Sequence, residues 1–138
     1  MKNRNEVSMG KILIVDDDLG TTKLLELVLI KEGYDVVTVN DSWDALSAAL
    51  THHPNLILLD LLMPRVDGFE VCKKLRAKSQ FAQTPIIFLT SVSDVEQKVA
   101  AFGSGASDYI VKPVHPQELK MRIKALIGNG NHGNGNHR

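Results

Sequence analysis

The stretch ILIVDD at residues 12–17 decides the fold, because four branched apolar residues run without polar alternation into a pair of acids. Similar runs recur in LILLD at residues 56–60, IIFLT at 86–90 and YIVKP at 109–113. Such runs predict strands buried on both faces, as in a parallel sheet covered by helices. Ligands of open parallel sheets bind beyond the carboxyl ends of the strands. The polar residues that end these runs are therefore expected to meet at one site.

Apolar residues recur at helical spacing in the segments between these runs. Five helix faces are predicted: Leu24, Leu25, Val28 and Leu29; Ala45, Leu46, Ala49 and Leu50; Val71, Cys72 and Leu75; Val95, Val99 and Phe102; and Leu119, Ile123, Leu126 and Ile127. Residues 35–39 supply a fifth strand. We expect Gly33 to end the first helix and Ser42 to cap the second. The alternation predicts an α/β fold, a doubly wound five-stranded parallel sheet with helices on both faces.

Composition favours one domain without a general affinity for nucleic acid or membranes. The 138 residues are 43% hydrophobic, which is enough for a core, and 16 basic residues balance 16 acidic ones. The single cysteine, Cys72, excludes an intramolecular disulfide and lies on a predicted apolar helix face, where a packed thiol is expected. No apolar stretch approaches the length of a membrane span. We therefore expect a cytoplasmic protein.

The residues at the strand ends fit the chemistry of a phosphoryl-accepting carboxylate. A carboxylate attacks a phosphorylated donor poorly because both are negative, so a divalent cation and fixed positive groups are needed. Asp16, Asp17 and Asp60 offer the hard oxygen ligands that suit Mg²⁺. Lys112 supplies a positive charge, and the Thr90 hydroxyl can donate to a phosphoryl oxygen. Asp60 is the best nucleophile, since it alone ends the central apolar strand and precedes a turn.

From about Lys11 to Ile127 the chain resembles a two-component response regulator receiver domain of the CheY-like type. The matching residues are Asp16-Asp17, Asp60 followed by Met63-Pro64 and Asp67-Gly68, Thr90-Ser91, and Tyr109 with Lys112-Pro113. Each motif alone is weakly specific, but the ordered set is highly specific. The resemblance implies a flavodoxin-like sheet with strand order 2-1-3-4-5.

The resemblance also implies a role for each site residue. Asp60 would be the phosphorylation site, and Asp16 and Asp17 would bind Mg²⁺ together with Asp60 and the Leu62 backbone carbonyl. Lys112 would pair with the phosphoryl group, and its bond to Pro113 would be cis. The protein would catalyse only its own phosphorylation and dephosphorylation.

A switch and two kinds of partner follow from the same resemblance. The phosphodonor would be a phosphohistidine on a sensor histidine kinase or a phosphotransfer protein. Thr90 would move toward the phosphoryl group and Tyr109 would turn inward behind it, changing the face formed by the fourth helix, last strand and fifth helix. A downstream protein would bind that face, without direct nucleic-acid contact or membrane insertion.

Neighbouring residues carry weaker expectations. Asp18 is expected to cap a helix or face solvent rather than bind metal. Leu62 and Val92 flank the path of attacking water in this family, and neither can orient water, so we predict slow autodephosphorylation. We expect an N-terminal extension at residues 1–10, a receiver domain at 11–127 and a disordered Gly/Asn/His tail at 128–138. The protein would be a stand-alone relay or a receiver cut from a longer chain.

Other protein classes fit less well. A P-loop nucleotidase needs a glycine-rich phosphate cradle after the first strand, where this chain has DDDLGTT at residues 16–22. A haloacid-dehalogenase-like phosphotransferase typically carries its nucleophile after the first strand, whereas the acceptor here is on a later strand. A flavodoxin-like FMN site is also disfavoured, because the three acids after the first strand would repel the FMN phosphate. The remaining alternative is a receiver-like interaction module whose partner binding needs no phosphorylation. Such a module would usually have lost one of the acids or the lysine.

Overall fold

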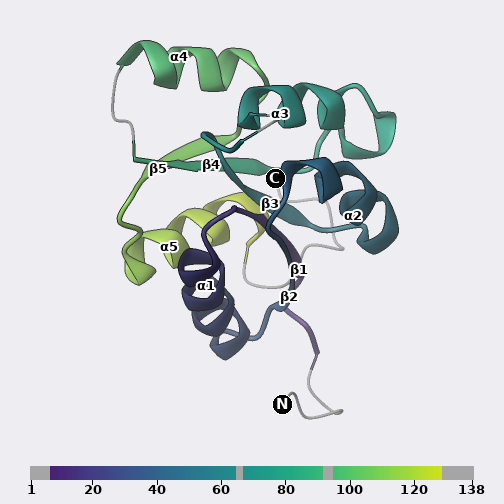
Figure 1. Cartoon of the computed structure of the whole chain (residues 1–138). Helices are drawn as coiled ribbons and strands as arrows, with labels where there is room; N and C mark the ends of the chain where they lie inside the picture. The colour runs from purple at the N-terminus through teal and green to yellow at the C-terminus, as the bar shows by residue number, and fades with distance from the viewer. Residues whose placement is uncertain (1–6, 65–66, 92–94, 129–138) are drawn as a thin grey trace.

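The protein folds as a five-stranded parallel sheet with strand order β2-β1-β3-β4-β5 (Figure 1). The computed structural model describes residues 7–64, 67–91 and 95–128. The strands are β1 (Lys11–Val15), β2 (Asp35–Val39), β3 (Leu56–Asp60), β4 (Ile86–Thr90) and β5 (Asp108–Val111). The helices are α1 (Leu19–Lys31), α2 (Ala45–His52), α3 (Gly68–Arg76), α4 (Val95–Gly103) and α5 (Pro116–Ile127), with short 3-10 helices η1 (Ser42–Asp44) and η2 (Ser79–Phe81). The predicted fold class and strand order are confirmed.

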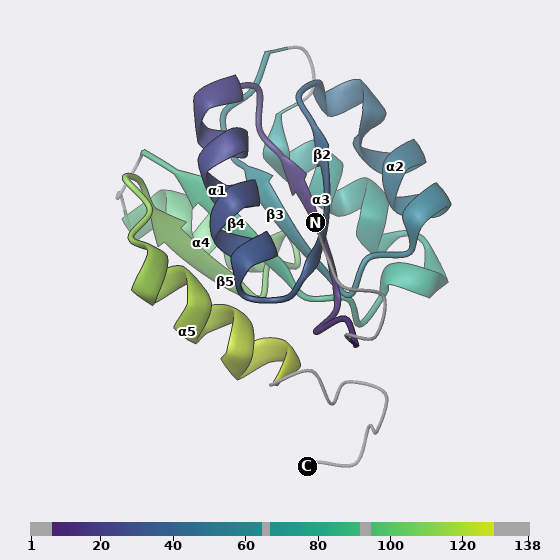
Figure 2. The ribbon, with the colours of Figure 1, turned by 90° about the horizontal axis from the view of Figure 1, so that it is seen from below.

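Helices cover both faces of the sheet, α1 and α5 on one side and α2, α3 and α4 on the other (Figures 1 and 2). Alternate side chains of each central strand enter opposite cores. In β1, Ile12 and Ile14 pack toward α1 and α5, whereas Leu13 and Val15 pack toward α2 and α3. Burial on both faces explains why β1, β3 and β4 contain almost no polar residue before their last position.

Strand register places the site at one edge of the sheet. Val15 pairs with Leu59, Asp60 with Leu89 and Thr90 with Val111. When neighbouring parallel strands end at paired residues, the residues that follow them lie close together. The acids, the threonine and the lysine therefore come from neighbouring strand ends.

Gly68 allows α3 to begin directly against the end of β3. A Cβ atom at this position would lie 2.5 Å from the Asp60 carbonyl oxygen and 2.8 Å from Leu61 Cα. The Gly68 amide also donates to the Leu61 carbonyl oxygen at 2.9 Å. The absence of a side chain at residue 68 thus fixes how closely a helix approaches Asp60.

Two predictions about the helices were wrong. Ser42 does not cap α2, because the Asp41 carboxylate accepts from the Trp43 amide and caps the intervening η1. The predicted buried face of α4 is exposed at all three positions, Val95, Val99 and Phe102, and Ala101 is the buried residue instead. Helical spacing identifies an apolar stripe but not whether the stripe faces the sheet.

The face of α1 is also displaced from the predicted one. Leu25 and Leu29 are buried as expected, but Leu24 is exposed and Thr22 is buried in its place. The helix ends at Lys31, and Gly33 follows with a φ of 100°, in the left-handed region that favours glycine. Across the three described ranges, no helix has both the length and the apolar character to cross a membrane.

Candidate functional site

Three carboxylates gather at the carboxyl ends of β1 and β3. Asp16 and Asp17 follow β1 directly, and Asp60 is the last residue of β3. One oxygen from each lies within 4.8 Å of the others. Asp16 and Asp60 are buried, whereas Asp17 is exposed. This set offers oxygen ligands for a divalent cation, with an open side through which waters or a phosphoryl group can complete its coordination.

Lys112 reaches the same acids from the loop after β5. Its Nζ lies 2.8 Å from Asp16 Oδ2 and 3.7 Å from Asp60 Oδ1. Burial alone would lower the pKa of Lys112, but the hydrogen bond to Asp16 and the charges of Asp16 and Asp60 raise it overall. The peptide bond to Pro113 is cis, as the sequence resemblance implied. Lys112 is thus a fixed positive charge beside Asp60.

The Asp60 carboxyl is poorly stabilised as an anion by the protein alone. Burial, and next the negative charge of Asp16, raise its pKa from 3.8 to about 7, although Lys112 opposes the rise. The Leu62 amide donates a long hydrogen bond of 3.4 Å to Asp60 Oδ1. A bound divalent cation would offset the excess negative charge, so the donor set fits such an ion.

The turn that carries Asp16 and Asp17 is held by hydrogen bonds. The Asp18 amide donates to Asp16 Oδ1 at 2.9 Å, and the Asp16 amide donates to the Val39 carbonyl oxygen. Asp18 caps α1 by accepting from the Gly20 amide. The expectation that Asp18 is a helix cap is confirmed.

Thr90 and Tyr109 lie on the α4 side of the site. Thr90 ends β4 and is fully buried, and Tyr109 is buried on the adjacent strand, opposite Phe88. Lys98 Nζ lies 5.7 Å from the centre of the Tyr109 ring, within the range of a cation–π contact.

Leu62, two residues after Asp60, has a side chain that is 52% exposed. Val92 and the tail from residue 129 lie outside the described residues, so the expectations about them stay predictions.

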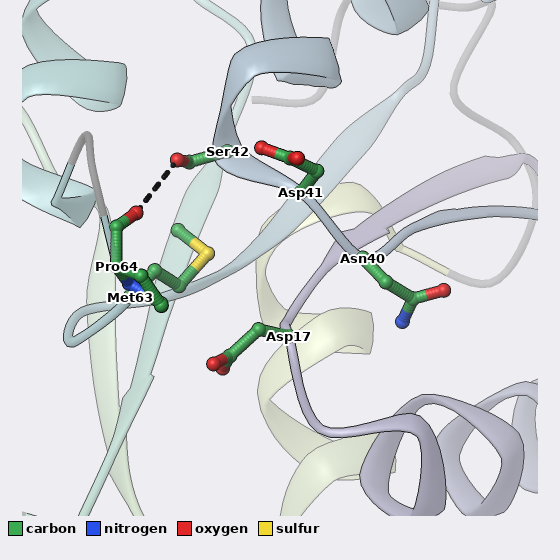
Figure 3. Close-up of a pocket in the computed structure, with 6 residues that line it drawn as sticks. All are labelled: Asp17, Asn40, Asp41, Ser42, Met63 and Pro64. Atoms are coloured by element: carbon green, nitrogen blue, oxygen red, sulfur yellow. Dashed lines mark hydrogen bonds between the residues drawn. The ribbon is translucent and has the colours of Figure 1, made fainter.

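A pocket of about 140 Å³ adjoins Asp17, the exposed member of the acid set (Figure 3). It is lined by Asp17, Asn40, Asp41, Ser42, Met63 and Pro64. The Ser42 hydroxyl donates to the Pro64 carbonyl oxygen at 3.2 Å and joins the two walls. Sequence reasoning missed Asn40 and Asp41, although a polar pair directly after a strand paired with β1 was an available indication.

Comparison with known proteins gives one consistent family. The family model described as response regulator receiver domain matches residues 12–124. The response regulator ArlR of Staphylococcus aureus is 46% identical over 119 residues, which are 86% of this chain and 53% of that protein. The chain spans about half the length of the curated relatives it matches.

Solved structures superpose on most of the chain. The chemotaxis protein CheY4 of Vibrio cholerae superposes with a TM-score of 0.82 at 32% identity, over 88% of this chain and 99% of that one. The receiver domain of sensor histidine kinase PA1611 from Pseudomonas aeruginosa superposes with a TM-score of 0.80 at 29% identity, over 86% of this chain and 98% of that one. That structure has a magnesium ion coordinated in its active-site cleft.

Proposed function

The chain belongs to the response regulator receiver domain family of two-component systems, and from this premise we propose that Asp60 accepts a phosphoryl group from a histidine kinase or a phosphotransfer protein. The observation that carries the proposal is the convergence of Asp16, Asp17, Asp60 and Lys112 at one edge of the sheet. Three carboxylates against one ammonium suit a site completed by a cation and a phosphoryl group.

Mg²⁺ would be held by the carboxylates of Asp16, Asp17 and Asp60 and by the Leu62 backbone carbonyl. When bound, it would neutralise phosphoryl oxygens and keep Asp60 ionised at neutral pH. The raised pKa of Asp60 supports this role, because the metal-free carboxyl is partly protonated near pH 7.

The residues of the chain would share the transfer step. An Asp60 carboxylate oxygen forms the bond to phosphorus as the phosphorus–nitrogen bond of the donor phosphohistidine breaks, and the electron pair stays on the imidazole nitrogen. Lys112, now paired with Asp16, would turn its ammonium to a phosphoryl oxygen. Thr90, at the same edge of the sheet, would donate its hydroxyl to another. The domain would act on its own aspartate alone and catalyse no other reaction than its phosphorylation and dephosphorylation.

The α4-β5-α5 face would transmit the phosphorylated state to a downstream protein in the cytoplasm. Thr90 ends β4, Tyr109 lies on the adjacent strand β5, and Lys98 of α4 lies over the Tyr109 ring, so a movement of these side chains would change the packing under α4. Three exposed apolar side chains on α4, those of Val95, Val99 and Phe102, support partner binding there. We assign the receiver domain to residues 11–127, from the start of β1 to the end of α5.

The test is incubation with Mg²⁺ and acetyl phosphate or phosphoramidate, followed by intact mass. We expect a gain of one phosphoryl group in the wild type and none in Asp60→Asn or without Mg²⁺. No gain, under conditions that modify an established receiver, would contradict the proposal. That result would favour the phosphorylation-independent interaction module, which the intact set of acids and lysine otherwise disfavours.

A further inference from the structure

One amide side chain braces the acidic turn between β1 and α1. Asn40 directly follows β2, which pairs with β1 so that Val39 lies opposite Val15. Its Nδ2 group donates to the Asp16 carbonyl oxygen at 2.8 Å and to Thr22 Oγ1 at 3.1 Å. Both hydrogens of the amide therefore have acceptors, one at each end of the turn.

The second contact continues into α1. Thr22 is buried, and its hydroxyl donates to the Leu19 carbonyl oxygen at 3.0 Å in the first turn of the helix. Asn40 thus connects the end of β1 to the start of α1, with Asp17 between the two anchored points. Figure 3 shows the Asn40 amide turned away from the Asp17 carboxylate, so Asn40 acts on the backbone of the turn and is no ligand.

Asp17 depends on this bracing more than its neighbours do. Asp16 is buried and paired with Lys112, and Asp60 belongs to a strand with partners on both sides. Asp17 is exposed, so the direction of its carboxylate follows the backbone on either side. Mg²⁺ demands near-ideal octahedral geometry, and a small rotation of the turn would spoil one of its ligands.

We propose that Asn40 is a positioning residue for the divalent cation, holding Asp17 in place through the Asp16 carbonyl oxygen and the Thr22 hydroxyl. The inference rests on the proposed magnesium site. Removing a side chain that orients metal ligands typically costs about 10–100-fold in metal affinity. We expect Asn40→Ala to weaken Mg²⁺ binding by about tenfold.

Asn55 offers a matched control, because it contacts the opposite end of β1 from the acids. Asn55 Oδ1 accepts from the Lys11 amide at 2.7 Å, so Asn55→Ala also removes an asparagine that anchors β1, but far from the acids. The Mg²⁺ dissociation constant is measured from backbone amide shifts in a MgCl₂ titration, and stability from urea unfolding. Asn55→Ala should lower stability while changing the dissociation constant by less than about twofold, as expected for a site it does not touch.

Asn40→Asp separates positioning from charge. Its carboxylate would add a negative charge near the cation, which by attraction alone would tighten binding, but it would face the Asp16 carbonyl oxygen and break the brace. We expect weaker binding than in the wild type. Tighter binding in Asn40→Asp would overturn the inference.

Thr22→Val keeps the shape of the side chain and removes the hydroxyl, and so tests the brace if Asn40 variants do not fold. We expect about threefold weaker Mg²⁺ binding, because one of the two contacts remains. Two results would overturn the inference while leaving the proposed function intact. One is a Mg²⁺ dissociation constant that is unchanged in both Thr22→Val and any folded Asn40→Ala, and the other is a weakening of Mg²⁺ binding in Asn55→Ala as large as in Asn40→Ala. A wild-type chain that binds no Mg²⁺ would overturn the proposed function with it.

Discussion

The two sides of the acidic site are held in different ways. On the β2 side, the turn that carries Asp16 and Asp17 is fixed by hydrogen bonds that Asn40 and Thr22 donate and by one that Asp18 accepts from the Gly20 amide. On the opposite side, α4 carries a fully buried side chain only at Ala101, among its described residues. The difference suggests that the cation side is built for constant geometry and the α4 side for movement.

Contacts at the far end of α4 sharpen this contrast. The Arg76 guanidinium donates to the carbonyl oxygens of Phe81, Thr84 and Gly105, and Cys72 Sγ donates to that of Ser104. The loop after α4 is therefore attached to α3. Movement of α4 would be expected as a pivot about this attached end.

The largest effect is expected at Gly68, where α3 begins directly against the end of β3. Gly68→Ala should destabilise the fold by roughly 3 kcal/mol, because the new Cβ meets the backbone of Asp60 and Leu61. Gly103→Ala is the matched control, since a Cβ there has open space and a helical alanine costs nothing. Urea unfolding measures both, and equal stability of the two variants would remove the argument for a tight approach of α3.

Loss of the Arg76 contacts should release the attached end of α4. Arg76→Met is expected to cost about 2 kcal/mol, because buried carbonyl oxygens lose charged donors. Amide hydrogen exchange at residues 104–106 should become faster than the loss of global stability explains. In β1, exchange should become faster only by the amount expected from the change in the free energy of global unfolding. Lys73→Met, at an exposed position of the same helix, should change neither. Uniform acceleration throughout the protein would contradict a local attachment.

Stability of the metal-free protein should fall as pH rises from about 4 to 7. The folded-state pKa of Asp60, about 7, lies above its ordinary 3.8, so the folded state binds more protons than the unfolded state in this window. The contribution of protonated Asp60 to the free energy of unfolding is therefore fully present below about pH 4 and is lost as the pH rises to about 7. Asp60→Asn removes this titration and should be more stable than the wild type by roughly 2 kcal/mol at pH 8.

Urea unfolding of both proteins in EDTA from pH 4 to 8 measures the difference. A constant gap between wild type and Asp60→Asn across this range would show that Asp60 does not titrate there. Saturating Mg²⁺ should narrow the gap by stabilising the wild type, because the ion binds the folded state.

The lifetime of the phosphoryl group should depend on Leu62, which is 52% exposed, and on the residue type at position 92. Leu62→Asn combined with Val92→Glu supplies groups that can orient water, so the phosphorylated half-life should shorten by about tenfold, equivalent to 1.4 kcal/mol. Loss of the phosphorylated mass with time gives the rate. A half-life unchanged or longer would contradict the prediction.

The smallest effect is expected on the surface of α4. Val99 is 66% exposed, so Val99→Ser should change stability by less than about 0.5 kcal/mol. Val71→Ser, at a buried position of α3, should cost several times more, because apolar burial is lost and a hydroxyl is buried. Comparable losses would mean that α4 packs more tightly than its exposed residues indicate.

The strands could be predicted because their signal is local. β1, β3 and β4 are uninterrupted apolar runs, and burial on both faces leaves that pattern in any short window. The predicted face of α1 was partly misplaced and that of α4 entirely, because Leu24 and Val99 have the right spacing yet face solvent. Periodicity locates a stripe, and packing against the sheet decides which side of the helix is covered.

By itself, the sequence determined the fold class, the family and the acids, threonine and lysine that end the strands. These features depend on neighbouring residues or on motifs in fixed order. Only the tertiary structure decided that Lys112 contacts Asp16, 96 positions away, and that Asn40 braces the acidic turn. Hydrogen bonds between distant residues depend on strand register and helix placement, and these follow from packing of the whole core.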